Sequence, residues 1–221
     1  MIKVHHLNNS RSQRVLWLLE ELQLDYDIVS YQRDKQTMLA PASLREVHPL
    51  GKSPVIEDKG EIIAESGAII DYLGRVYGAG TWRPTEQQAH FQQYQYWLHF
   101  AEGSMMSPLL LKLVMQKIVS NAPALFIRPI AKGIADRVNE NFIQPNLIRL
   151  LTYVDTHLKI HDWFAGEEIS GADIQMSFPL EASMHRGLTL PYEGINEYVQ
   201  RVQARPAYQR ALKRGGQYDY A

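Results

Sequence analysis

The sequence has 221 residues, a formal net charge of −1 and 45% hydrophobic residues, an ordinary globular composition with room for one large domain or two small ones. Lysine and arginine are scattered, so the charge pattern indicates neither a nucleic-acid partner nor a membrane-surface partner. No apolar run reaches the roughly 18 residues of a membrane span. The segment Met1–Leu7 lacks a signal-peptide core, so we expect a cytoplasmic protein.

The absence of cysteine limits the chemistry further. Without a thiol the chain can form no disulfide, no zinc–thiolate site, no cysteine nucleophile and no CxxC redox pair. Any thiol chemistry must therefore use a thiol that arrives with a ligand. His157 and His161 stand four residues apart, but the sequence shows no third ligand beside them, so we expect no metal.

The first part of the chain mixes strand and helix patterns. The expected elements are a strand over 2–7, a helix over 10–24, a strand over 26–31, a polar stretch over 32–40, a short helix over 41–47, strands over 55–57 and 61–64 turned at 58–60, and a helix over 66–77. The helix over 10–24 is a crossover between two strands, which predicts that these strands pair in parallel.

The second part, after a linker that contains Gly78, Gly80 and Pro84, has helical periodicity throughout. The expected helices cover 87–101, 108–119, 124–158, 172–187 and 195–214, the third of them bent near Pro129 and Pro145. The sequence thus predicts a small α/β domain over 1–80 and an all-helical domain over 87–221.

The junction between the first strand and the first helix carries the first chemical motif. A helix N-terminus offers unpaired N–H groups and a positive dipole end, which can stabilise an anion such as a thiolate. Ser10 and Gln13 also fit a capping box, S-x-x-Q. The two roles are compatible, because a capping hydroxyl accepts from the backbone and can still donate its own hydrogen.

Two further motifs lie before the third strand and before the helix over 66–77. In the segment His48–Pro54, a proline at a strand entry is compatible with a cis bond between Ser53 and Pro54, which would free neighbouring backbone groups for an extended peptide ligand. Ser66 is a natural N-cap that follows Glu65, and that helix start suits a carboxylate from a ligand. The alternatives are a plain loop and a simple cap.

Taken in order, these motifs resemble the cytosolic glutathione transferase family, most closely the subset shared by bacteria and fungi. The segments that carry the resemblance are Ser10–Glu21, His48–Pro54, Glu65 to Leu73 and Ser170–Ile174. The last of these is an S-x-x-D capping box, which we interpret as structural. The resemblance implies a thioredoxin-like N-terminal domain, an all-α C-terminal domain and a homodimer, with the helices over 72–77 and from Gln87 as contact elements.

The resemblance also implies that glutathione lies across the first domain as a co-substrate, with no other cofactor. Ser53 would pair its backbone with the cysteinyl part through the Pro54 turn, Glu65 and Ser66 would hold the γ-glutamyl end, and Lys52 would lie near the glycine end.

For thiol activation the resemblance indicates a serine-type site. Ser10 is the first candidate, with Asn9 and Ser12 as alternatives, because family members differ by a residue in the distance from the serine to the helix arginine, here Arg14. No tyrosine stands near the end of the first strand, which excludes the tyrosine type.

The expected activity is attack of the bound thiolate on a small apolar electrophile, or reduction of an organic hydroperoxide. Trp97, Met105 and Met106 are candidates for the wall of the second-substrate pocket, with core packing as the alternative for each. The rival functions are a non-catalytic binding module of this fold and a glutathione-dependent isomerase or dehalogenase.

Overall fold

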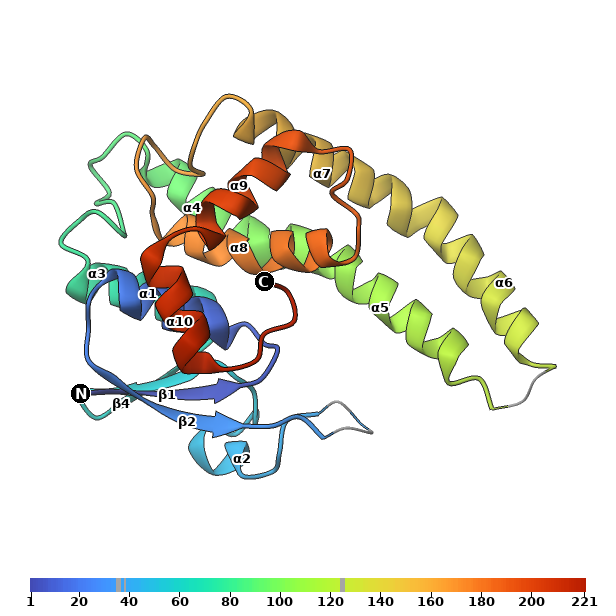
Figure 1. Cartoon of the computed structure of the whole chain (residues 1–221), viewed down its shortest axis with the longest axis horizontal. Helices are drawn as coiled ribbons and strands as arrows, with labels where there is room; N and C mark the ends of the chain where they lie inside the picture. Colours follow the sequence, from blue (N-terminus) through green and yellow to red (C-terminus); the bar gives the residue numbers. More distant parts are fainter. Residues whose placement is uncertain (35–36, 38, 124–125) are drawn as a thin grey trace.

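The computed structural model describes residues 1–34, 37, 39–123 and 126–221. The described residues form, in chain order, β1 (Ile2–Leu7), α1 (Ser12–Glu21), β2 (Tyr26–Tyr31), α2 (Leu44–Val47), β3 (Val55–Asp58), β4 (Glu61–Ala64), α3 (Ser66–Tyr77), α4 (Phe91–Phe100), the π-helical segment η1 (Ala101–Met105), α5 (Met106–Ser120), α6 (Arg128–Val138), the π-helical segment η2 (Asn139–Ile143), α7 (Gln144–Leu158), α8 (Gly171–His185), α9 (Glu193–Gln203) and α10 (Pro206–Gly215). A mixed α/β part is thus followed by a helical part (Figure 1).

The described strands form one sheet in the order β2-β1-β3-β4. Val4 of β1 faces Ile28 of β2 in a parallel register and Ile56 of β3 in an antiparallel register, and β3 pairs with β4 as a hairpin. The hairpin turns at Lys59 and Gly60, both with positive φ, which is the backbone that a two-residue turn between twisted strands requires. The predicted parallel pair, the hairpin and the thioredoxin-like fold class are confirmed.

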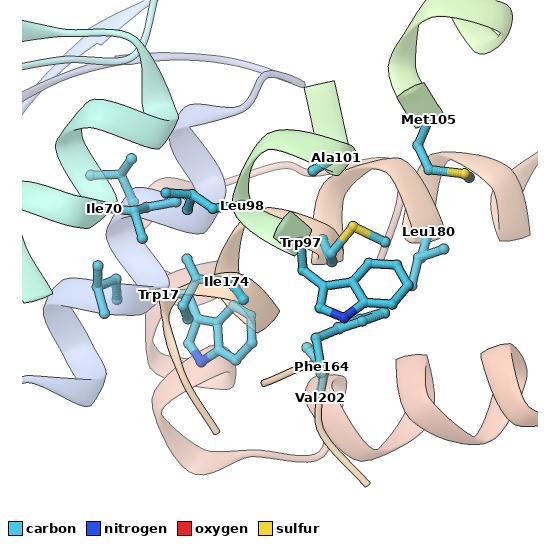
Figure 2. Packing of buried hydrophobic residues seen from close by; sticks show 14 of the residues in the cluster. Trp17, Ile70, Trp97, Leu98, Ala101, Met105, Phe164, Ile174, Leu180 and Val202 are labelled. Carbon is cyan, nitrogen blue, oxygen red and sulfur yellow. The ribbon is translucent and has the colours of Figure 1, made fainter. Parts of the chain in front are cut away.

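The α/β part and the helical part share one apolar core. Trp17, Ile70, Leu98 and Ile174 come from α1, α3, α4 and α8, and all four are buried in the same cluster (Figure 2). Helix α10 returns along α1, where Tyr208 packs edge-on against Trp17 with ring centroids 5.5 Å apart (Figure 1). Because full burial of one such side chain contributes about 1.5–3 kcal/mol, the two parts stabilise each other.

Prolines set several helix ends differently from the sequence prediction. The expected helix over 195–214 is two helices, α9 and α10, because Pro206 lacks an N–H and Arg205 before it is extended, with ψ 133°. Pro129 lies at the start of α6, and Pro145 at the start of α7, directly after the π-helical turn η2. Residues 124 and 125 of the expected helix over 124–158, and 35, 36 and 38 of the polar stretch, lie outside the described residues.

A membrane-spanning helix must be both long and apolar. None of the helices in the described ranges combines the necessary length with enough apolar character.

Candidate active site

The end of β1, the start of α1 and the loop before β3 meet at one backbone group. The N–H of Leu7 donates to Ser12 Oγ at 3.3 Å and to Ser53 Oγ at 3.2 Å, and the Ser53 hydroxyl donates to a backbone carbonyl of β1 at 2.8 Å. The peptide bond between Ser53 and Pro54 is cis, as predicted. Lys52, which precedes them, is exposed. The loop that carries Ser53 is thereby fixed beside the start of the first helix.

Ser10 is buried, with 3% of its surface exposed, and its hydroxyl lies 2.8 Å from that of Ser12. The expected capping box between Ser10 and Gln13 does not form, and the prediction that the helix begins at Ser10 is wrong. Helix α1 begins at Ser12, and Ser10 Oγ accepts the N–H of Ser12 at 3.2 Å instead of that of Gln13. The side-chain amide of Gln13 is buried without a hydrogen-bond partner among the described residues.

Asn9 is held by the C-terminal segment. Its backbone has a positive φ of 48°, and its side-chain amide exchanges two hydrogen bonds with Asp219. Asn9 Nδ2 donates to Asp219 Oδ2 at 2.6 Å, and the backbone N–H of Asp219 donates to Asn9 Oδ1 at 2.9 Å. Residues 210 positions apart in the sequence therefore fix this corner of the site.

The start of α3 is tied to α1 through Arg14. The Arg14 guanidinium is buried and donates to Ser66 Oγ, to the carbonyl of Gln175 and to Glu102. Ser66 is the first residue of α3, so the expectation that it is the N-cap is wrong. The cap position belongs to Glu65, whose carbonyl accepts the N–H of Ile69 in the first helical turn. Glu65 itself is exposed and has a positive φ of 68°, a strained backbone for a residue with a side chain.

Glu102, in η1, was not anticipated from the sequence. Its carboxylate accepts from Arg11 Nε at 2.8 and 3.0 Å and from Arg14. Burial acts to raise the pKa of Glu102, but the charges of Arg14 and Arg11 and their hydrogen bonds prevail and lower it. Burial lowers the pKa of Arg14, and Glu102 opposes that change. A π-helical turn often marks a functional site, but the sequence patterns did not predict a π-helical turn at this position.

An apolar cleft of about 1200 Å³ opens beside Asn9 and Arg11. Its walls come from α5, α6, α8 and the C-terminal segment. The described residues that line it are Asn9, Arg11, Arg33, Thr37, Met106, Leu110, Leu113, Val114, Lys117, Ile118, Asn121, Ala122, Pro123, Ile127, Ala131, Phe178, Ala182, Arg186, Asp219 and Tyr220. Apolar side chains predominate in this set, so the cleft suits an apolar ligand.

Of the three pocket residues considered from the sequence, only Met106 is among the described residues that line this cleft. Trp97 and Met105 are buried in the core (Figure 2). The Trp97 ring lies 4.7 Å from that of Phe164 and 4.8 Å from that of His157, between centroids. Packing within the helical part therefore accounts for Trp97, and His157 belongs to the same aromatic cluster. Within the described ranges, no group of three or more potential ligands gathers to hold a metal ion.

A second, polar cavity of about 190 Å³ lies at the ends of β1, β2 and α10. The described residues that line it are His6, Asn8, Asn9, Ser30, Gln32, Gly215, Gly216 and Gln217. Asn9 borders both cavities, so the apolar space and the polar one adjoin at this residue.

Both parts of the chain are similar in sequence to known proteins. Residues 10–76 match a family model described as glutathione S-transferase, N-terminal domain, and residues 143–206 match one described as glutathione S-transferase, C-terminal domain. The chain is 36% identical over 216 residues to glutathione S-transferase 3 of Schizosaccharomyces pombe, which covers 97% of this chain and 88% of that protein. It is 32% identical to glutathione S-transferase 1 of Saccharomyces cerevisiae, over 94% of this chain and 92% of that protein.

Among solved structures, a glutathione S-transferase from Actinobacillus pleuropneumoniae superposes with a TM-score of 0.76 at 29% identity, covering 97% of this chain and 93% of that one.

Proposed function

The chain belongs to the glutathione S-transferase family, and we propose that it conjugates reduced glutathione to small apolar electrophiles with Ser10 beside the reacting thiol. The observation that carries this proposal is the convergence of three chain segments at the start of α1. Ser12 and Ser53 share the N–H of Leu7, and Arg14 joins α1 to Ser66. Segments that the sequence singled out separately thus lie side by side, which supports one shared binding site.

In this proposal glutathione lies along the edge formed by the loop before β3 and the start of α3. The cis bond before Pro54 supports backbone pairing of Ser53 with the cysteinyl part. The exposed Glu65 and the N-terminal N–H groups of α3, with Ser66, suit the amino and carboxylate groups of the γ-glutamyl end. Lys52 is exposed beside that loop, where its charge suits the glycine carboxylate.

The chemical task is to ionise a thiol near neutral pH. An unperturbed thiol has a pKa of about 8.5, so only about 3% is thiolate at pH 7. Lowering that pKa by about two units takes roughly 2.7 kcal/mol of preferential thiolate stabilisation. A hydroxyl donor together with a helix N-terminus can supply this amount.

We prefer Ser10 to Asn9 and Ser12 as the residue beside the thiol because of the hydrogen bonds that the other two already make. Both atoms of the Asn9 amide bond to Asp219, which leaves one N–H of Nδ2 for any other acceptor. The Ser12 hydroxyl is fully buried and lies within hydrogen-bonding distance of Leu7, His6 and Ser10. Ser10 follows Asn9 and precedes Arg11, two residues that line the apolar cleft. A thiolate held at Ser10 would therefore adjoin the space for the second substrate.

The first test replaces Ser10 by alanine. With an activated aromatic halide, Ser10→Ala should lower kcat by about tenfold to a hundredfold, as the loss of one donor to a developing charge does. It should also raise the pKa of bound glutathione, seen in the ultraviolet absorbance of the thiolate, with little change in glutathione affinity. Ser177→Ala is the matched control, because Ser177 is equally buried and donates only within α8. If Asn9→Ala lowers kcat and Ser10→Ala does not, Asn9 is the residue that stabilises the thiolate.

The second test addresses glutathione binding itself. Calorimetric titration should show one site per chain, and Glu65→Ala should weaken it by about tenfold or more, as expected for loss of a charge-assisted contact. Glu61→Ala, at an exposed glutamate of β4, should leave it unchanged. Unchanged glutathione affinity in Glu65→Ala would contradict the proposed binding of glutathione at Glu65 and Ser66. Binding without turnover of any electrophile would favour the non-catalytic module, and a panel that includes hydroperoxides and halogenated substrates distinguishes the other reactions.

The proposal extends to the domains, the assembly and the location. We infer two domains, 1–80 and 87–221, and a homodimer whose contacts involve α3 and α4. Exposed apolar side chains on β4 and α4, Ile62 at 54% and Tyr96 at 47%, are available for such contacts. Light scattering that shows only a 25.4 kDa species at micromolar concentration would count against the dimer. The cytoplasmic location stays a prediction, to be tested by cell fractionation.

A further inference from the structure

A row of hydrogen-bonding groups leads from Ser10 into the interior, away from the cleft. The hydroxyls of Ser10 and Ser12 lie 2.8 Å apart, and Ser12 Oγ lies 2.8 Å from Nδ1 of His6. His6 is buried, with 4% of its surface exposed, yet it borders the polar cavity at the ends of β1, β2 and α10.

The tautomer of His6 decides the direction of every bond in this row. In the neutral tautomer that carries its hydrogen on Nε2, Nδ1 of His6 is an acceptor. Ser12 must therefore donate to His6, since the Leu7 carbonyl, the other acceptor near Ser12, is more distant at 3.2 Å. A hydroxyl has one hydrogen, so Ser12 cannot also donate to Ser10, and Ser10 donates to Ser12.

With these bond directions, the Ser10 hydroxyl has no hydrogen free for a ligand before the reaction begins. Ser10 already uses its hydrogen on Ser12, and one of its lone pairs accepts the N–H of Ser12. Towards a bound thiol, Ser10 consequently presents a lone pair. It can accept the S–H hydrogen, but it cannot yet donate to a thiolate.

We propose that Ser10, Ser12 and His6 form a proton relay that carries the thiol proton of bound glutathione out of the active site through the interior. The thiol proton passes to Ser10 Oγ, the hydrogen of Ser10 passes to Ser12 Oγ, and the hydrogen of Ser12 passes to His6 Nδ1. Each serine gives one proton and receives one, the sulfur keeps the electron pair of the broken S–H bond, and His6 becomes an imidazolium. Ser12 and His6 are positioning residues that act through Ser10.

The transfer reverses every hydrogen bond in the row. Ser10 then donates to the thiolate, Ser12 donates to Ser10, and the imidazolium donates to Ser12. Because Ser10 now points its hydrogen at the sulfur, the same step that forms the thiolate also provides the hydrogen bond that stabilises it.

The polar cavity that His6 borders gives the proton a way out to solvent. It is lined by His6 together with amide, hydroxyl and backbone groups, which suits ordered water. Burial lowers the pKa of His6, partly offset by the Gly215 carbonyl, so the imidazolium releases its proton readily. A route of this kind leaves the cleft free to exclude water while an apolar electrophile is bound.

The test measures how fast the thiolate forms, because a relay changes the rate and not the final equilibrium. This inference rests on the proposed function, so wild-type protein mixed rapidly with glutathione must first show thiolate absorbance. In His6→Asn the amide oxygen can still accept from Ser12 but cannot take up a proton. We expect thiolate formation to slow by at least about tenfold, with the final absorbance and the glutathione affinity unchanged.

Two further variants keep the test independent of folding defects at position 6. Ser12→Ala should slow thiolate formation in the same way, and Ser12→Thr, which retains the hydroxyl, should restore it. His5→Asn is the matched control, because His5 is equally buried in β1 but its ring bonds to Tyr31 and Glu57. The wild-type rate should also fall in deuterated solvent, and this isotope effect should shrink in both slow variants.

Wild-type rates in His6→Asn and Ser12→Ala would overturn the relay while leaving the proposed function intact. A fall in final absorbance to the same extent as the rate would assign His6 and Ser12 a structural role and would also overturn the relay. Absence of any thiolate in the wild-type protein would instead contradict the proposed function.

Discussion

The proposed glutathione site and the apolar cleft beside it are built in opposite ways. Around the start of α1, hydroxyls and charges are buried and hydrogen-bonded to one another, as Arg14 is to Glu102 and Ser66. The cleft wall on α5 instead exposes apolar side chains, with Leu110 at 54%, Val114 at 42% and Ile118 at 48% of their surface. One region presents fixed polar geometry to the proposed ligand, and the other presents exposed apolar side chains.

This difference decides what a substitution can do in each region. A buried polar group left without its partner costs about 1–3 kcal/mol, so changes near α1 affect both stability and chemistry. An exposed apolar side chain contributes little to folding, so changes in the cleft act on the second substrate alone. Variation in the cleft can therefore alter substrate choice without disturbing thiol activation.

The largest effect should follow from removing Glu102, the carboxylate that neutralises Arg14. Among the described residues, Glu102→Ala leaves the buried Arg14 guanidinium with Ser66 and a backbone carbonyl as its acceptors. We expect the free energy of unfolding to fall by about 3 kcal/mol, the low end for a broken buried pair because Glu102 is one-third exposed. Glutathione affinity should fall with it, since Arg14 holds Ser66. Chemical denaturation and calorimetric titration measure the two effects.

Asp136→Ala serves as the control for Glu102→Ala. Asp136 pairs with Lys132 on the surface of α6, where both side chains are more than half exposed. Its removal should change neither stability nor glutathione binding measurably. If the two variants behave alike, Arg14 does not depend on Glu102, and the polar region is less tightly coupled than we infer.

A smaller effect concerns Glu181, where the C-terminal segment that borders both cavities is anchored. Its buried carboxyl accepts from Tyr218 at 2.8 Å and from Tyr208. Burial raises the pKa of Glu181 from 4.5 to about 7, although both tyrosines oppose the rise. The folded state therefore holds a proton that the unfolded state releases between these pH values, and stability falls as pH rises through about 7.

Between pH 5 and pH 8, wild-type protein should lose about 2 kcal/mol of unfolding free energy relative to Glu181→Gln. The variant is neutral throughout, so it lacks this loss. Glu168→Gln, at an exposed glutamate, should follow the wild-type curve. A Glu181→Gln curve parallel to wild type from pH 5 to 8 would show that Glu181 is ionised in the folded state at the lower pH.

The sequence predicted what local patterns determine. The parallel strand pair, the hairpin turn at Lys59 and Gly60, and the cis bond before Pro54 follow from periodicity and turn chemistry within short segments. Helix starts were less predictable. Ser10 and Ser66 both have good capping side chains, but Ser10 bonds to Ser12 and Ser66 to Arg14, so neither is the cap.

Other parts of the site depend on contacts that no local pattern encodes. Glu102 reaches Arg11 across 91 positions, and Asp219 reaches Asn9 across 210. Apolar helix residues such as Trp97 and Met106 fit a core or a pocket equally well in a single sequence. Tertiary packing decides between these roles, and it buries Trp97 while Met106 lines the cleft.

The smallest effect, and the most selective, is expected from a charge placed in the cleft. Leu110 lies on α5 in the cleft wall, about half exposed, so Leu110→Asp should leave the fold intact. An apolar electrophile that covers Leu110 gains part of the roughly 1.5–3 kcal/mol that full burial of such a side chain provides. We therefore expect KM for an apolar electrophile to rise by about tenfold, with KM for glutathione and the thiolate pKa unchanged. Ile148→Asp is the matched control, because Ile148 is 50% exposed on α7 and is not among the described residues that line the cleft. Equal increases in both variants would assign the effect to surface charge in general. An increase in KM for glutathione instead would show that the polar and apolar regions are not separable, and the contrast between them would fail.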